Sequence, residues 1–333
     1  MNLRELNRTL LLRQMLLERK RISVAKAVAK LVALQAQYAP SPYVALWSRL
    51  DGLTKSQIDG AFARGSIVNA GTLRSTVHVM AATEYPSIEA ACIDTQRGRI
   101  ANLGVDVDTI RAAFPDEPVN GAEGRALASR ALGTDDEWTI SFALRALPFL
   151  RTPPVGPWPH TKPPPYVLFR DPLPDPDGAA TRVVRAYVAG YGPATRNDIE
   201  QYTGFRIRQI APALERFRTF EGEDGQIYYD VPRAPVADGR VDAPVRFLPA
   251  FDSIILAHRD RARIVPPEYM EAVFNKKNAT TKNTFTVDGF VAGAWRIEKR
   301  KLVVDPFAPL PVKWRREVDA EGERLLAWYL GSD

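Results

Sequence analysis

The sequence has 333 residues, 45% of them hydrophobic and 25% charged, which is ordinary for a globular protein and excludes a disordered, collagen-like or coiled-coil chain. One cysteine and three histidines exclude a disulfide framework and a zinc site built from cysteine and histidine pairs. The formal net charge of +6 favours a polyanionic partner. We therefore expect a cytoplasmic protein that uses neither metal nor cofactor.

The basic charge is concentrated in two segments. Residues 1–30 contain eight Lys or Arg and two acids, and residues 251–301 contain ten and six, whereas residues 99–137 contain four and eight. This alternation fits a basic groove backed by an acidic surface, and a solvated helix face explains any single run equally well. Charges interrupt the apolar residues near the N-terminus every few positions, so neither a signal peptide nor a membrane span is expected.

The first hundred residues predict helices followed by a hairpin. An apolar stripe over residues 10–16 predicts the first helix, and Ser23 and Thr54 are suitable N-caps for two more. We expect Pro40 to end the helix that follows Ser23. The β-branched run over residues 67–82 predicts two strands around a turn. Helices followed by a hairpin are typical of a winged-helix module.

Two further copies of this pattern follow. The first spans residues 107–169 and leads into a segment, residues 148–176, that holds eleven of the 27 prolines and argues against a regular helix or a central strand. The second copy begins with a helix over residues 181–192 and continues with a helix capped by Thr195. A third helix there begins near Arg206, and a hairpin turns at residues 223–225.

The remainder of the chain is rich in strands. We expect apolar strands from Val245 onward, including Ile254 to Leu256, a hairpin at Asp288-Gly289, and a terminal helix over residues 321–330.

The expected fold class is α+β, with three tandem winged-helix modules and a strand-rich C-terminal segment. We place these units at residues 1–100, 101–176, 177–244 and 245–333.

The segment from Leu34 to Pro40 carries the strongest candidates for chemistry, Gln35 and Gln37. On a helix these side chains project to nearly opposite sides, so both can face one site only if the helix ends near them, as Pro40 allows. An amide is not a general base at neutral pH, but its oxygen can hold a water and its NH2 group can donate. The alternative is a pair of surface polar residues. Phosphate-binding loops and GxSxG elbows are absent from the sequence.

Five segments of the sequence together resemble a bacterial family of tandem winged-helix DNA glycosylases that unhook interstrand cross-links. The resemblance is to the branch of that family with a Gln-apolar-Gln motif. In order along the chain, the segments are LVALQAQ, PYVALWSRL, TLRSTVHV, GPATRNDIEQYTGF and RFLPAFDSIILAHRDRARIVP. The resemblance implies three winged helices around a basic concave surface and a metal-free monofunctional glycosylase. It also implies that Gln35 and Gln37 position the water that attacks C1′ of an N7-alkylated guanosine. The role implied is base excision repair or self-resistance to a DNA-alkylating natural product.

DNA contacts are expected from Arg74, Thr76 and His78 within TLRSTVHV, and from Arg206 and Arg208 at the start of the helix that such modules place against DNA.

A third set of contacts is expected from Arg259, Arg261 and Arg263. In an extended strand these arginines share one face at a spacing of roughly 6 to 7 Å, near the phosphate repeat of one DNA strand. The alternative is that Asp252 or Asp260 neutralises them in a structural ion-pair network.

The expected partner is double-stranded DNA that carries alkylated or cross-linked guanine, bound by a monomer associated with the nucleoid and not with a membrane. Two alternatives differ in class. One is a non-enzymatic winged-helix regulator, although the sequence has no long heptad-patterned helix to form the usual dimer. The other is an adaptor that binds nucleic acid only for recruitment.

Overall fold

The structure is a computed structural model that describes residues 1–101, 106–153, 164–275 and 277–331, with the backbone alone for residues 94–101. Helices and strands are mixed along the whole chain, so the α+β class is confirmed. Within the described residues no helix is both long and apolar enough to span a bilayer.

The first hundred residues form the expected helices and hairpin. The elements are α1 (Leu3–Arg13), α2 (Val24–Lys30), α3 (Ser41–Trp47), α4 (Lys55–Ala63), β2 (Ile67–Gly71), η1 (Leu73–Ser75), β3 (Val77–Ala81) and α5 (Tyr85–Ala101). Ser23 and Thr54 are confirmed as N-caps, since each hydroxyl accepts a bond from a backbone N–H three residues on. The expected role of Pro40 is wrong: α2 already ends at Lys30, and Pro40 precedes the first turn of α3.

A five-stranded antiparallel sheet joins this region to the next. Its order is β1-β3-β2-β4-β5, with β1 (Leu34–Gln35), β4 (Phe149–Arg151) and β5 (Tyr166–Leu168). The prediction that the proline-rich segment holds no central strand is wrong, because β4 pairs with β2 on one side and with β5 on the other. The strand fits between Pro148 and Pro153, where four consecutive residues keep their N–H groups. Residues 154–163 of that segment lie outside the described residues.

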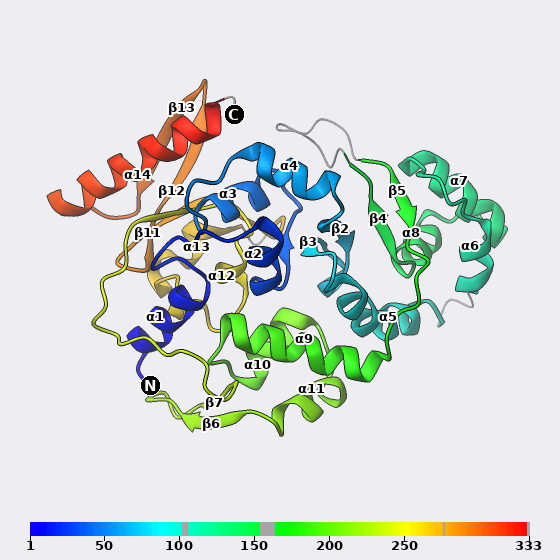
Figure 1. Ribbon diagram of the computed structural model, residues 1–333, viewed down its shortest axis with the longest axis horizontal. Helices are drawn as coiled ribbons and strands as arrows, with labels where there is room; N and C mark the ends of the chain where they lie inside the picture. The colour runs from blue at the N-terminus through cyan, green and yellow to red at the C-terminus, as the bar shows by residue number, and fades with distance from the viewer. Residues whose placement is uncertain (102–105, 154–163, 276, 332–333) are drawn as a thin grey trace.

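The second region forms a lobe with its own hydrophobic core (Figure 1). Its helices are α6 (Val107–Ala113), α7 (Gly121–Leu132) and α8 (Glu137–Arg145), as the sequence predicts. Asn120 and Asp136 cap α7 and α8. The lobe lies at one end of the longest molecular axis.

The third region contains three helices and a hairpin. Its elements are α9 (Pro176–Tyr191), α10 (Arg196–Thr203), α11 (Ile207–Leu214), β6 (Arg218–Glu221) and β7 (Ile227–Asp230). Thr195 caps α10 through a capping box, as predicted. Near its C-terminal end α9 packs so closely on the end of α2 that a Cβ at Gly190 would lie 2.7 Å from the carbonyl oxygen of Lys30.

The C-terminal region is built on a four-stranded sheet of order β13-β12-β11-β8. Its elements are β8 (Arg246–Leu248), α12 (Ser253–Leu256), η2 (Arg261–Arg263), η3 (Pro267–Tyr269), α13 (Met270–Val273), β9 (Phe274–Asn275), β10 (Thr280–Thr281), β11 (Thr284–Val287), β12 (Phe290–Glu298), β13 (Lys301–Pro306) and α14 (Val312–Leu330). The Asp288-Gly289 hairpin is confirmed, and the terminal helix begins earlier than predicted.

The expected strand at Ile254 to Leu256 is wrong, because these residues form the short helix α12. Pro249, directly after β8, has no N–H to donate to a β-sheet hydrogen bond, so the strand ends there. Asp252 then accepts a hydrogen bond from the N–H of Ile254 and caps α12.

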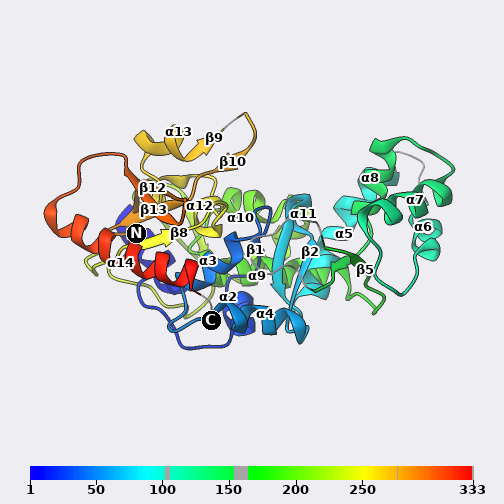
Figure 2. The same ribbon diagram turned by 90° about the horizontal axis from the view of Figure 1, so that it is seen from above.

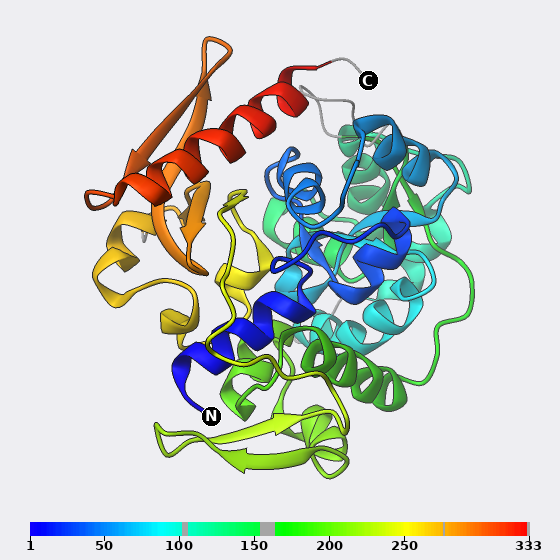
Figure 3. The ribbon, with the colours of Figure 1, turned by 60° about the vertical axis from the view of Figure 1, so that its left-hand side comes forward.

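Buried ion pairs fasten the N-terminal helices to distant parts of the chain. Arg49, after α3, binds Asp252 at 2.7 Å with both side chains fully buried, and Arg13 in α1 binds Asp230 in β7 at 2.8 Å. Figure 3 shows α1 between the third region and the C-terminal region. One apolar core includes residues from the first hundred residues, the third region and the C-terminal region, whereas the lobe of α6 to α8 has a separate core.

Candidate active site

Gln35 lies in the short strand β1 and Gln37 follows it in a bend, well beyond the end of α2 at Lys30, so the expected helical setting is wrong. Gln35 belongs to β1 and stands opposite His78 of β3, and the N–H of Ala36 continues the ladder by donating to the Val77 carbonyl at 2.8 Å. Gln37 lies beyond the last residue of β1, and the bend after this strand places its amide beside that of Gln35.

The two glutamine side chains are hydrogen-bonded to each other. Gln35 Nε2 donates to Gln37 Oε1 at 2.6 Å. Gln35 is only 8% exposed, whereas Gln37 is exposed. A carbonyl oxygen has two lone pairs, so Gln37 Oε1 can still accept a second hydrogen bond, and its NH2 group has two donors. A water at Gln37 would thus meet an amide whose orientation Gln35 already fixes.

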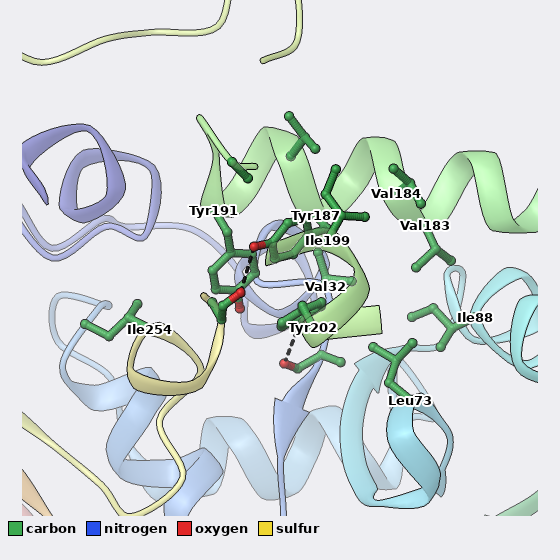
Figure 4. Close-up of a cluster of buried hydrophobic side chains, with 14 of the residues drawn as sticks. Val32, Leu73, Ile88, Val183, Val184, Tyr187, Tyr191, Ile199, Tyr202 and Ile254 are labelled. Carbon is green, nitrogen blue, oxygen red and sulfur yellow. Dashed lines mark hydrogen bonds between the residues drawn. The ribbon is translucent and has the colours of Figure 1, made fainter. Parts of the chain in front are cut away.

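Buried tyrosines hold the turn that leads from α2 into β1 (Figure 4). Tyr191 Oη donates to the Leu31 carbonyl at 2.7 Å, and Tyr202 Oη donates to the Ala33 carbonyl at 3.4 Å. Val32, between them, adopts the left-handed conformation with a φ of 63°. β-branched residues avoid this conformation, so the surrounding contacts must impose it. The third region therefore determines where β1 and Gln35 lie.

Arg74 contacts the glutamine pair from the other side. One terminal nitrogen donates to Gln35 Oε1 at 3.4 Å, the other donates to the Tyr202 carbonyl, and the guanidinium lies 5.4 Å from the centre of the Tyr202 ring. Burial lowers the pKa of Arg74. Because Arg74 faces the oxygen of Gln35, the NH2 group of Gln35 is directed to Gln37. The structure thus places this expected DNA ligand against a candidate catalytic residue.

His78 is buried beneath the same site. It is 2% exposed, and its Nδ1 lies 3.0 Å from the Thr76 carbonyl oxygen. Burial, with a further contribution from the charge of Arg74, lowers the pKa of His78 to about 3. The imidazole is therefore neutral at pH 7 and carries no charge to offer a phosphate. Thr76 is half-buried, with its hydroxyl 3.4 Å from His78 Nε2.

Gln37 lies between two cavities. One, of about 480 Å³, opens toward the lobe of α6 to α8 and is lined by Thr76 and by three arginines, Arg125, Arg145 and Arg151. The other, of about 790 Å³, opens toward the C-terminal sheet. Figure 2 shows β1 and α3 between that sheet and β2. The exposed amide can therefore reach a molecule that enters from either side.

The three arginines of the smaller cavity are not among the residues expected from the sequence. Arg151 is half-buried in β4, burial lowers its pKa, and among the described residues no carboxylate forms an ion pair with it. Arg145 is exposed, and Arg125 binds Glu137 at 3.0 Å. A partly buried guanidinium without a counterion favours binding of an anion. Nothing in the sequence marks these residues, since Arg125 comes from the acidic segment, Arg151 from the proline-rich segment and Arg145 from the stretch between them.

Arg206 and Arg208 are exposed at the N-terminal end of α11, where the sequence places them. This end of the helix lies near the glutamine site, because Gly204, two residues before Arg206, packs on Arg74: a Cβ at Gly204 would lie 3.4 Å from Arg74 Cγ.

The prediction that Arg259, Arg261 and Arg263 form a row on one face of a strand is wrong. Asp260 accepts a bond from the N–H of Ala262 and starts the 3-10 helix η2, so the three side chains enter different surroundings. Arg259 is exposed and the Arg261 guanidinium lies 4.2 Å from the Phe274 ring.

Arg263 itself is only 5% exposed, and it donates to the Pro193 carbonyl at 2.8 Å. The alternative in which Asp252 neutralises the row is also wrong, because Asp252 binds Arg49.

The remaining histidines and the single cysteine complete the reactive groups of the chain. Among the described residues, no three His, Cys, Asp or Glu side chains gather where they could hold a metal ion. His258 is buried and burial lowers its pKa to about 3, while burial raises the pKa of the Cys92 thiol. His160 lies outside the described residues.

The chain is similar to known proteins. A family model described as "DNA glycosylase AlkZ-like" matches residues 28–328. An "Interstrand DNA cross-link repair glycosylase" of Streptomyces sahachiroi is 29% identical over 153 residues, a match that spans 42% of this chain and about two fifths (41%) of that protein. The solved structure of the Streptomyces sahachiroi DNA glycosylase AlkZ superposes with a TM-score of 0.79 at 19% identity, covering 99% of this chain and 96% of that one, and shows a common fold.

Proposed function

The chain belongs to the AlkZ-like DNA glycosylase family, and we propose that it is a monofunctional glycosylase that excises N7-alkylated guanine from duplex DNA and unhooks interstrand cross-links. The observation that carries the proposal is the hydrogen-bonded pair of Gln35 and Gln37, with the Gln37 amide exposed between two cavities. The non-enzymatic regulator is not favoured, because the family and the curated relative are glycosylases.

The reaction breaks the bond between C1′ and N9 and forms a bond between C1′ and a water oxygen. Alkylation at N7 gives the guanine a positive charge, so the electron pair of the broken bond leaves with a neutral base and no acid needs to protonate it. The sugar becomes cationic, and the water loses its proton to solvent as it attacks. Neutral His78 and the two amides are consistent with this low demand for acid and base catalysis.

In this mechanism Gln37 Oε1 accepts a hydrogen bond from the attacking water and holds it at C1′, which lowers the entropic cost of the attack. Gln35 fixes the Gln37 amide, and Arg74 fixes the Gln35 amide. The phosphates of the bound DNA contribute electrostatic stabilisation of the cationic sugar. Gln37 is thus the residue that touches the reacting water, and Gln35 and Arg74 are positioning residues.

We assign DNA binding to cationic groups on both sides of this pair. Arg125, Arg145 and Arg151 lie in the smaller cavity, and Arg206 and Arg208 stand at the exposed start of α11. Contacts from arginine to phosphate set the register of the protein on the duplex without reading its sequence. Thr76 borders the smaller cavity and is proposed to contact the sugar-phosphate backbone.

The fold proposed for this activity is three tandem winged-helix modules and a strand-rich C-terminal region, at residues 1–100, 101–176, 177–244 and 245–333. Each of the first three units holds helices followed by paired strands. The protein is proposed to act as a monomer on nucleoid DNA in the cytoplasm, without a metal or cofactor.

The test is a single-turnover assay on a duplex that contains one N7-methylguanine, and on a duplex with a guanine-to-guanine interstrand cross-link. We expect release of the intact base, an abasic strand that breaks only after alkali, and separation of the cross-linked strands on a denaturing gel, all in the presence of EDTA. Gln37→Ala should lose at least tenfold in rate while the duplex affinity stays within twofold. Tight duplex binding without base release would overturn the proposal in favour of a DNA-binding regulator.

A further inference from the structure

The larger cavity beside Gln37 has an aromatic wall. Its volume is about 790 Å³, and its lining includes Tyr38, Phe251, Trp295 and Phe307. Cavities of about 300–1,000 Å³ accommodate drug-sized ligands, so this one has room for more than a water or a methyl group. Tyr38 and Phe251 lie in segments that the sequence analysis singles out, but the sequence gives none of these four residues a role.

The aromatic groups offer hydrocarbon surface and few unsatisfied polar atoms. Trp295 is buried, and its indole N–H already donates to the Leu248 carbonyl at 2.9 Å. Phe307 packs against Tyr269 with the ring centres 5.2 Å apart. Tyr38 directly follows Gln37 and is 47% exposed. The wall is therefore suited to a flat apolar group, which stacks favourably on aromatic rings.

The position of Phe251 is imposed by its neighbours. Its φ is 61°, a conformation that residues other than glycine rarely adopt. The Phe251 N–H donates to Thr281 Oγ1 at 2.6 Å, and the preceding N–H, of Ala250, donates to Asn283 Oδ1 at 2.7 Å. A strained backbone conformation of this kind is retained where the surrounding contacts hold it in place, and such conformations are concentrated at ligand sites.

The same loop is tied to the catalytic segment. Ser41 Oγ, four residues beyond Gln37, donates to the Ala250 carbonyl at 2.6 Å. The aromatic wall and the Gln37 amide are thus held at fixed positions relative to each other. A site needs this if it binds one part of a molecule and reacts with another part.

We propose that this aromatic pocket binds a planar apolar substituent carried by the modified guanine while Gln37 addresses the sugar. The inference rests on the proposed glycosylase function and adds a basis for its selectivity. A substituent that stacks in the pocket contributes binding energy that a methyl group cannot supply, so the enzyme should favour bulky aromatic adducts over small ones.

The experiment compares single-turnover efficiency on two duplexes that differ only in the adduct, N7-methylguanine or N7-benzylguanine. We expect the wild-type protein to favour the benzyl adduct by about tenfold. Phe251→Ala and Phe307→Ala should reduce this ratio to near one. Ala294→Leu, which adds bulk to the cavity from β12 without removing a ring, should do the same and serves if an alanine variant fails to fold. Trp138→Ala, at an exposed aromatic of α8 that does not line the pocket, is the matched control and should keep the wild-type ratio.

The outcomes separate the two claims. A wild-type protein that releases neither base contradicts the glycosylase function, and the pocket assignment falls with it. A wild-type protein that releases both bases with equal efficiency, or whose preference survives in all three pocket variants, overturns the pocket assignment and leaves the glycosylase function standing.

Discussion

Arg74 and Gln35 face each other across 3.4 Å, with the guanidinium directed to the amide oxygen, although 39 residues separate them in the chain. The second terminal nitrogen of Arg74 donates a hydrogen bond to the Tyr202 carbonyl. This arginine therefore links the third region to the glutamine pair, and its role differs from that of a phosphate ligand.

Arg74→Lys should slow base release about tenfold, equivalent to about 1.4 kcal/mol in the barrier, because one ammonium cannot reach both Tyr202 and Gln35. The dissociation constant for duplex DNA and its salt dependence should stay within twofold of wild type. Single-turnover kinetics and binding titrations at several salt concentrations measure both. A rate of base release equal to that of wild type would show that Arg74 does not position Gln35.

Gln35→Glu should reduce the rate of base release by at least tenfold, with an effect near that of Gln35→Ala. An ionised carboxylate has no hydrogen to donate to Gln37 Oε1, so it loses the 2.6 Å bond despite its similar size. Gln226→Ala, at an exposed glutamine in the β6–β7 turn, is the control and should behave as wild type. Full activity in Gln35→Glu would show that the Gln35 amide does not position Gln37.

Arg145→Gln and Arg151→Gln should weaken binding to duplexes of any sequence and should each flatten the slope of log affinity against log salt by about one unit. Arg170→Gln is a matched control on the same lobe, because that arginine is already paired with Asp116. Fluorescence anisotropy on two unrelated duplexes distinguishes the outcomes. A loss restricted to one duplex sequence would indicate base readout and contradict the phosphate assignment.

Asp252→Asn should lower the free energy of unfolding by about 3–5 kcal/mol, because it leaves the fully buried Arg49 guanidinium without its counterion. The double variant Arg49→Met/Asp252→Leu should recover most of that loss, since it removes both buried charges together. Urea unfolding of the three proteins measures the difference. Equal stability of Asp252→Asn and wild type would mean that the pair contributes nothing to the junction between α3 and α12.

The stability of the fold should fall on acidification because of His78 and His258. Both have folded-state pKa values of about 3, below the unfolded value of about 6.5. Their stabilising contribution is therefore complete above pH 6.5 and is lost as the pH falls toward 3, at up to about 1.4 kcal/mol per pH unit for each histidine. Urea unfolding between pH 7.5 and 5 tests this, with His78→Asn as comparison. A slope that His78→Asn leaves unchanged would assign the acid sensitivity to other groups.

Local hydrogen bonding made much of the secondary structure predictable. Ser23, Thr54 and Thr195 each satisfy an N–H within their own helix, and Asp288-Gly289 closes its own hairpin, so these boundaries follow from neighbouring residues alone. The Gln-apolar-Gln spacing likewise marks the candidate pair, because the motif is contained in a single short segment of the chain.

Long-range contacts decided the rest. β1 forms because residues 77–79 pair with it and because tyrosines of the third region fix the preceding turn. No local sequence pattern therefore predicts a strand at Gln35. Asp260 and a buried environment, not strand alternation, determine where Arg263 points. The sequence by itself determined which residues can cap, turn and donate. Only the tertiary structure decided which of them meet, because the free energy that selects a strand at residues 34–35 or a cavity beside Gln37 comes from partners tens to hundreds of residues away.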